Sequence, residues 1–270
     1  MSFIASETEQ ETEIHILHVD DQPSILDLTA TMLQRQSDQF EIETVTSVSD
    51  GCDRLADTAF DCIISDYDMP GQTGIEFLET VREEYSDFPF ILYTGKGSEE
   101  IASDAISAGV TDYLQKGAGL DQYTVLANRV RNVVKVYRAQ QTLSELKLKD
   151  RAMDTAPVGI TVSDPSQDDN PLIYLNDRWT EITGYAAEEV LGSNPRFLQG
   201  EDTNPESVAR IRESIDEEEP VTVELRNYRK DGTVFWNRVS IAPVRGDDGE
   251  VTNYVGFQQD VTEQIALDYP

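Results

Sequence analysis

Five side chains in the first half of the chain have types and positions suited to phosphoryl chemistry. Three carboxylates, one hydroxyl and one amine each lie at the end of a short apolar run: Asp20, Asp21, Asp66, Thr94 and Lys116. Mg²⁺ prefers oxygen ligands and readily shares them with phosphate. A lysine can meet the extra charge of a phosphorylated carboxylate, and a hydroxyl can donate to a phosphoryl oxygen. The pattern predicts a site for a hard cation and a phosphoryl group.

The apolar runs that carry these residues alternate with helical patterns. Runs rich in β-branched residues predict strands at 14–20, 41–47, 60–66, 88–94 and 111–116. Their alternation with helices predicts an α/β domain with a flavodoxin-like, doubly wound, five-stranded parallel sheet. Because such sheets place their sites at the carboxyl ends of the strands, we expect the five side chains to converge on one edge.

A long helix and a different pattern follow. Residues 121–153 contain neither proline nor glycine and predict a connector helix, whose apolar residues at spacings of three and four suggest a parallel homodimer. A helix packed only on its own chain is the alternative. Short strands with KDG and DDG turns then predict an α+β domain with an antiparallel sheet. The expected parts are 13–120, 121–153 and 154–264.

A second candidate site lies in the last part, where amides stand among apolar positions. An amide offers a donor and an acceptor together, which the mixed edge of a flavin or another heteroaromatic ring requires. Two arginines, Arg196 and Arg212, have the chemistry to clamp a phosphate through bidentate bonds. The amide residues are Asn194, Gln199, Asn227, Asn237 and Gln258.

Residues 13–136 resemble the receiver domains of two-component response regulators. The motifs that carry the resemblance are the Asp20-Asp21 pair, Asp66 with Met69-Pro70 and Gly74, then Thr94, Tyr113 and Lys116. One departure is that Gly117 follows Lys116, where the family usually carries proline. The resemblance implies a histidine kinase or a phosphotransfer protein as the phosphodonor partner.

The same resemblance assigns roles to these residues. It implies that Asp66 is the phosphoacceptor, that Lys116 lies beside it, and that Thr94 and Tyr113 form the switch pair. It also implies Mg²⁺ bound by Asp21 and Asp66 directly, by Asp20 partly through water, and by the backbone carbonyl of Asp68.

Residues 156–264 resemble a PAS domain of the light-oxygen-voltage (LOV) subclass, through NPLIYLN, GSNPRFLQG, RIR, NYRKDGTVFWN and GFQQDVT. The resemblance implies FMN, or FAD, in a pocket where Asn194, Asn227 and Asn237 contact the ring and Gln199 and Gln258 flank it. It implies that Arg196 and Arg212 hold the phosphate.

The LOV motif carries a cysteine where this chain has Pro195. Proline offers no nucleophile, and Cys52 and Cys62 both lie in the first domain, so we expect no cysteinyl adduct. The prediction is a two-component signalling protein whose flavin domain signals by photoreduction or redox change. We expect no output domain after residue 264, so that output would pass through dimer rearrangement, through the connector helix or to a separate, unknown protein.

Two other interpretations stay open. In the first, Pro195 marks an empty pocket, the PAS domain is a dimerisation or docking module, and the protein is a phosphorylation-controlled adaptor. In the second, the domain is a flavoenzyme, but no acid/base pair stands near the pocket residues. We expect the protein not to be an enzyme.

The charge balance limits the partners. The 270 residues hold 52 Asp and Glu against 21 Lys and Arg, a formal net charge of −31. This surplus repels phosphate backbones and anionic lipids, so we expect neither nucleic acid nor membrane as a partner. A hydrophobic content of 39% predicts a folded, acid-coated protein, either from a halophilic organism or an ordinary acidic cytosolic one.

The chain also lacks targeting signals. No apolar stretch approaches the ~20 residues that cross a bilayer, and the first residues do not resemble a signal peptide. We therefore expect a cytoplasmic protein. Cys52 and Cys62 are in no metal or redox spacing, so we expect two packing residues without a disulfide.

Overall fold

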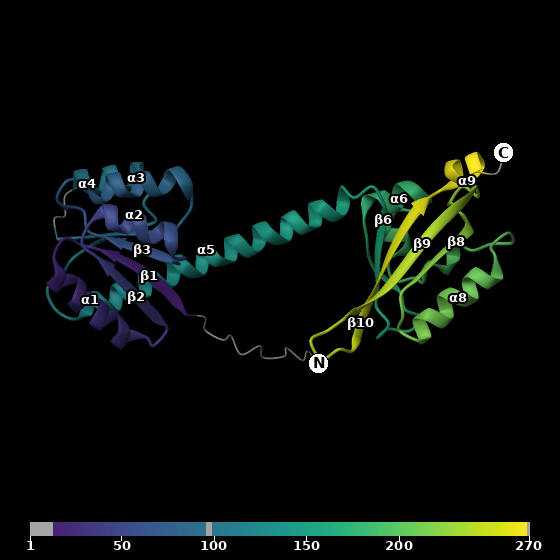
Figure 1. The fold of residues 1–270 in the computed structure, drawn as a ribbon, viewed down its shortest axis with the longest axis horizontal. Helices are drawn as coiled ribbons and strands as arrows, with labels where there is room; N and C mark the ends of the chain where they lie inside the picture. Colours follow the sequence, from purple (N-terminus) through teal and green to yellow (C-terminus); the bar gives the residue numbers. More distant parts are fainter. Residues whose placement is uncertain (1–12, 96–98, 269–270) are drawn as a thin grey trace. The chain divides into compact units, whose positions relative to one another are not determined.

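A computed structural model of the chain describes residues 13–95 and 99–268. The chain divides into two compact units between Ser144 and Glu145 (Figure 1). Within the described residues, no helix is long and apolar enough to span a bilayer.

The first unit is a five-stranded parallel sheet in the order β2-β1-β3-β4-β5. This confirms the predicted doubly wound α/β architecture and the long helix after it. Its elements are β1 (Ile14–Val19), α1 (Pro23–Gln36), β2 (Phe40–Val45), α2 (Val48–Asp57), β3 (Cys62–Ser65), α3 (Gly74–Glu84), β4 (Phe90–Thr94), α4 (Glu99–Ser107), β5 (Asp112–Gln115) and the part of α5 (Asp121–Asp154) that ends at Ser144.

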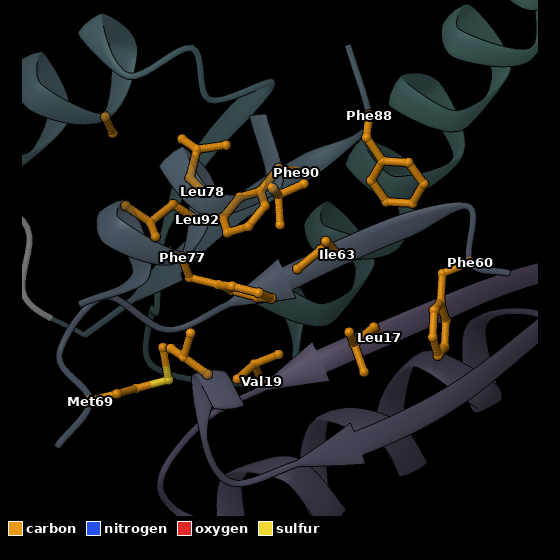
Figure 2. Packing of buried hydrophobic residues seen from close by; sticks show 13 residues of the cluster. Leu17, Val19, Phe60, Ile63, Met69, Phe77, Leu78, Phe88, Phe90 and Leu92 are labelled. Atoms are coloured by element: carbon orange, nitrogen blue, oxygen red, sulfur yellow. The ribbon is translucent and has the colours of Figure 1, made fainter. Parts of the chain in front are cut away.

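Apolar side chains fill both faces of this sheet. On one face, residues of β1, β3 and β4 pack against α2, α3 and α4, and Figure 2 shows Phe77 of α3 beside Ile63 and Val19. The rings of Phe77 and Phe90 meet edge to face, with centroids 5.6 Å apart. On the other face, Leu33 of α1 and Val130 of α5 belong to a second buried cluster. Burial on both faces explains why the strands read as continuous apolar runs.

The turn between β3 and α3 is tightly packed. The hydroxyl oxygen of Thr73 accepts from the backbone N–H of Glu76, whose carboxylate accepts from the backbone N–H of Thr73, so a capping box begins the helix. A Cβ on Gly74 would lie 2.1 Å from the backbone oxygen of Asp66. Only glycine therefore lets α3 begin so close to the backbone of Asp66.

The second unit is an antiparallel sheet in the order β7-β6-β10-β9-β8, which confirms the predicted α+β architecture. Its elements are β6 (Gly159–Ser163), β7 (Leu172–Leu175), α6 (Asp177–Thr183), α7 (Ala187–Val190), the 3₁₀ helix η1 (Pro195–Leu198), α8 (Pro205–Asp216), β8 (Val221–Tyr228), β9 (Val234–Arg245), β10 (Val251–Asp260) and α9 (Thr262–Asp268).

Burial alternates along β8, so that Val221, Val223, Leu225 and Asn227 face inward. Val208 and Ile211 of α8 pack against these apolar residues. The period of two therefore places one polar side chain, the amide of Asn227, in an otherwise apolar row.

The amide of Asn176 joins three segments of the second unit. Its Oδ1 accepts from the backbone N–H of Ile160 at 2.8 Å and from that of Trp179 at 3.1 Å, which caps α6. Its Nδ2 donates to the backbone oxygens of Met153 in α5, at 2.7 Å, and Val158, at 3.1 Å. Because Asn176 is 1% exposed, water cannot replace these bonds.

We expect Asn176→Ala to lower the free energy of unfolding of the second unit by about 3 kcal/mol, because it leaves buried backbone groups without partners. Asn204→Ala is the matched control, since Asn204 caps α8 at the surface and its loss should cost about 1 kcal/mol. Denaturant unfolding followed by tryptophan fluorescence measures both, because Trp179 and Trp236 lie in this unit. Equal losses in the two variants would contradict the role given to burial.

Candidate functional site

The carboxyl ends of β1, β3 and β5 bring two carboxylates and an amine together. Lys116 Nζ lies 2.7 Å from Asp20 Oδ2 and 2.5 Å from Asp66 Oδ1. Asp66 and Lys116 each come one residue after the strand that they were expected to end. Asp20 is fully buried and Asp66 is 6% exposed. The ammonium therefore lies between two buried carboxylates, at the edge where convergence was predicted.

The remaining oxygens of these aspartates are also engaged. Asp66 Oδ2 accepts from the backbone N–H of Asp68 at 2.8 Å, and Asp20 Oδ1 accepts from that of Gln22 at 2.9 Å. In the described part of the chain, the buried Oδ1 of Asp21 has no hydrogen-bond partner.

This all-oxygen set suits Mg²⁺, and the unpartnered Asp21 oxygen suits a metal ligand. However, the described residues contain no group of three or more acidic, His or Cys side chains already arranged around one point. The four predicted metal-binding aspartates are thus neighbours rather than a preformed ligand cage, with Lys116 between two of them.

The predicted switch pair lies on the two strands next to this cluster. Thr94, the last residue of β4, is fully buried. Tyr113, on β5, packs its ring against the core cluster of β1, β3 and β4. The Tyr113 hydroxyl is buried, and among the described residues it has no hydrogen-bond partner.

His18, on β1, is fully buried. Neither ring nitrogen has a hydrogen-bond partner within the described ranges. Burial and, to a smaller extent, the charge of Lys116 lower the pKa of His18 from 6.5 to about 3, although the charge of Asp66 opposes them. The imidazole is therefore neutral at ordinary pH. Its position next to the strand end is visible in the sequence, but its lack of partners is not.

The second unit contains a cavity lined by all five predicted amides. Its volume is about 120 Å³, which is below the 300–1,000 Å³ typical of small-molecule sites. Asn227, Asn237 and Gln258 reach it from β8, β9 and β10, each almost fully buried. Asn237 Nδ2 donates to Asn227 Oδ1 at 2.9 Å and to Gln258 Oε1 at 3.1 Å.

One hydrogen-bond acceptor of this amide network is not used. Asn237 Oδ1 is buried without a partner among the described residues. Since an unpaired buried acceptor is costly, a ligand that donates a hydrogen bond there would complete the network. The residues present therefore fit a planar heteroaromatic ligand such as the flavin ring.

Asn194, Arg196 and Gln199 also line the cavity, but two of them are already engaged. Asn194 caps η1 through the backbone N–H of Arg196, and its Nδ2 donates to the backbone oxygen of Asp169 at 2.6 Å. The Arg196 guanidinium lies 2.7 Å from an Asp169 carboxylate oxygen. A phosphate at Arg196 would thus compete with Asp169.

The structure does not bring Arg212 to this cavity. Arg212 is exposed on α8 and lines a neighbouring hollow with Gln199, Gly200 and Thr203. The two predicted phosphate-clamping arginines therefore border different hollows, which share only the Gln199 side.

Pro195 lines the cavity in the position where the LOV motif has cysteine. The two cysteines are free thiols in the first unit, Cys52 in α2 and Cys62 in β3. Burial raises the pKa of the Cys62 thiol, which makes it a poor nucleophile.

One aromatic cavity residue was not predicted. Tyr254 is 5% exposed, lines the cavity, and donates its hydroxyl to the backbone oxygen of Ile215 at 2.8 Å. The signal was its place on β10 four residues before Gln258, because residues at even spacing on a strand share a face. Gly256, between them, lines the cavity as well.

Comparisons with known proteins agree with this division. Residues 16–128 match the response regulator receiver domain family, and residues 157–263 match the PAS domain family. Over 238 residues the chain is 37% identical to the bacterioopsin transcriptional activator of Halobacterium salinarum, which covers 84% of this chain and 35% of that protein.

Two further similarities cover shorter stretches of the chain. Over 114 residues the chain is 50% identical to a blue-light photoreceptor of Listeria monocytogenes, covering 42% of this chain and 45% of that one. A solved structure described as "Flavin Analogue Sheds Light on Light-Oxygen-Voltage Domain Mechanism" is 45% identical, with a TM-score of 0.42, over 44% of this chain and 88% of that one. The chain thus spans less than half of either curated relative.

The buried His18 predicts a specific pH dependence of stability. Its folded-state pKa is depressed, so the unfolded chain binds a proton near pH 6.5 and the folded chain only near pH 3. Stability should therefore fall as the pH drops from about 6.5 towards 3, by about 2 kcal/mol at pH 5. His18→Phe should remove this part of the acid sensitivity, measured by thermal unfolding at pH 7 and pH 5 in metal-free buffer of constant ionic strength. An unchanged pH dependence in the variant would contradict it.

Proposed function

Because this chain joins a response regulator receiver domain to a PAS domain, we propose that it is a two-component signalling protein and not an enzyme. Its receiver would accept a phosphoryl group on Asp66 from a histidine kinase or a phosphotransfer protein. The observation that carries this proposal is the Lys116 ammonium, 2.5 Å from Asp66 and 2.7 Å from Asp20 at the carboxyl edge of the sheet.

The residues around Asp66 have complementary tasks. Asp20, Asp21 and Asp66, with the backbone carbonyl of Asp68, would hold Mg²⁺, which when bound offsets negative charge on a phosphoryl group. Lys116 would remain paired with Asp66 after transfer, because the phosphorylated carboxylate carries more charge than the free one. The Thr94 hydroxyl would donate to a phosphoryl oxygen.

We propose that the PAS domain binds a flavin, FMN or FAD. The three linked amides and the unpartnered Asn237 oxygen at the cavity wall support this, as does the 50% identity to a protein named as a blue-light photoreceptor. A bound flavin would supply absorption of blue light and electron transfer. Asn227, Asn237 and Gln258 would bind the polar edge of the ring.

Pro195 limits the signal that this domain can give. With a proline at the cavity wall and both thiols in the other unit, we propose signalling by photoreduction or redox change without a cysteinyl adduct. The same residue favours a second candidate, in which the PAS domain is a docking or dimerisation module of a phosphorylation-controlled adaptor.

We also propose how the chain assembles, what kind of cell it comes from and which partners it contacts. Leu143, Leu146 and Leu148 of α5 are more than half exposed, which suits a helix that pairs with a second copy of the chain. The charge of −31 and the identity to a Halobacterium protein support a halophilic, cytoplasmic protein. The same charge favours output through another protein rather than direct contact with nucleic acid or membrane.

We expect Asp66→Asn to abolish phosphorylation by acetyl phosphate and Mg²⁺, because the amide cannot accept the phosphoryl group. The measurement is intact-protein mass spectrometry, which detects the mass of one added phosphoryl group. Asp57→Asn, at the exposed end of α2, is the matched control and should behave as the wild type. Equal labelling of the two variants would contradict the assignment.

We expect the purified protein to bind FMN and show structured absorption in the blue. Gln258→Leu should weaken binding about five- to tenfold, the effect of one hydrogen bond. Gln259→Leu should leave it unchanged, because this neighbour on β10 is exposed while Gln258 is buried. Fluorescence titration measures the affinities. A wild-type protein that takes up no flavin would favour the adaptor instead.

A further inference from the structure

The side chain of Gln122, in the first turn of α5, contacts two segments that end at the phosphoacceptor site. Its Oε1 accepts from the hydroxyl of Tyr93 on β4 at 2.6 Å and from the backbone N–H of Gly117 at 3.0 Å. Its Nε2 donates to the backbone oxygen of Gly119 at 2.9 Å. One amide thus joins the end of β4, the turn after β5 and the start of α5.

The bond to Gly117 depends on the residue type at that position. Proline has no backbone N–H, so a proline after Lys116 would leave Gln122 without this donor. Gly117 supplies the donor but gives the turn more conformational freedom than proline would. The hydrogen bond from the Gly117 N–H to the Gln122 side chain therefore limits the conformational freedom of the turn.

This turn carries Lys116, whose position depends on its two neighbouring bonds. The backbone N–H of Lys116 donates to the oxygen of Thr94 at 2.8 Å, and the next N–H, that of Gly117, donates to Gln122. The backbone is thus fixed at successive amides. From there, Lys116 Nζ reaches the Asp20 and Asp66 carboxylates.

Gln122 also holds the ring of Tyr93, which the ammonium of Lys116 contacts. Lys116 Nζ lies 5.6 Å from the centroid of the Tyr93 ring, within the range of a cation–π contact. Tyr93 is 1% exposed, and burial raises the pKa of its hydroxyl, which therefore remains protonated and donates to Gln122. The turn that carries Lys116 and the Tyr93 ring that its ammonium contacts are therefore both hydrogen-bonded to the same oxygen, Gln122 Oε1.

We propose that Gln122 is a positioning residue for phosphorylation of Asp66: its Oε1 holds the Lys116–Gly117 turn and Tyr93, and so sets where the ammonium lies. The inference rests on the proposed phosphoacceptor role of Asp66. With acetyl phosphate, an Asp66 carboxylate oxygen forms a bond to phosphorus while the bond from phosphorus to the acetyl oxygen breaks, and acetate leaves with that electron pair. Lys116 stays protonated throughout.

The test compares Gln122→Leu with Gln122→Glu. Leucine removes the acceptor oxygen, whereas glutamate keeps acceptors for both donors and loses only the donor to Gly119. We expect Gln122→Leu to slow phosphorylation by acetyl phosphate about fivefold, the effect of one lost hydrogen bond. Gln122→Glu should remain within about twofold of the wild type. Gln141→Leu, the same change at an exposed position of α5, should have no effect.

A second readout needs neither metal nor phosphodonor. Hydrogen exchange of the Gly117 amide, measured by NMR on the full chain without Mg²⁺, should be about tenfold faster in Gln122→Leu and unchanged in Gln122→Glu. Exchange and phosphorylation should thus change together across the variants. Thermal unfolding identifies a variant that fails to fold, and for that case Gln122→Met, which keeps the length of the side chain, replaces Gln122→Leu.

The outcomes separate the two proposals. A wild-type protein that acetyl phosphate does not label at Asp66 would overturn the phosphoacceptor assignment, while the exchange of Gly117 would still report on the contact with Gln122. Labelling of Gln122→Leu at the wild-type rate would overturn the positioning role alone. The role would also be overturned if Gln122→Glu were as slow as Gln122→Leu.

Discussion

The pairing of one partly buried amine with two buried carboxylates constrains the whole first unit. Asp20 and Asp66 lie where charge is costly unless it is paired, and Lys116 meets both of them. The three residues follow β1, β3 and β5, and β4 separates β5 from β3 in the sheet. The strand order, the turn after β5 and the start of α5 must all be correct for the ammonium to reach both partners.

The second unit differs from the first because its buried polar side chains are neutral and need hydrogen bonds rather than an opposite charge. Asn227, Asn237 and Gln258 satisfy much of one another's hydrogen bonding, so the cavity wall persists without a charge pair. Among the described residues, Asn237 Oδ1 has no hydrogen-bond partner. Neutral amides suit a ligand whose edge has alternating hydrogen-bond donors and acceptors. The amide network of the second unit therefore leaves one buried hydrogen-bond acceptor without a partner among the described residues, whereas the first unit pairs its buried carboxylates with an ammonium.

Much of this arrangement was predictable from strand periodicity alone. Apolar runs gave the strands, and the rule for parallel sheets brought Asp20, Asp66 and Lys116 to one edge. Contacts that depend on side-chain reach were not predictable. Arg212 was paired with Arg196 by charge, yet α8 directs it to a neighbouring hollow. The contacts of Gln122 could not be predicted from the sequence, because a glutamine in the first turn of a helix is usually solvated. The glycine after Lys116 was the one feature that pointed to them.

Gly74 has an evolutionary consequence. Any side chain at this position would collide with the backbone oxygen of Asp66, so the first residue of α3 depends on the path of the backbone at Asp66 and not on its carboxylate. The requirement of the fold for this turn therefore acts on a residue that has no functional group. Among descendants of this sequence, glycine at position 74 should therefore persist for as long as the turn between β3 and α3 is kept, whatever side chain stands at position 66.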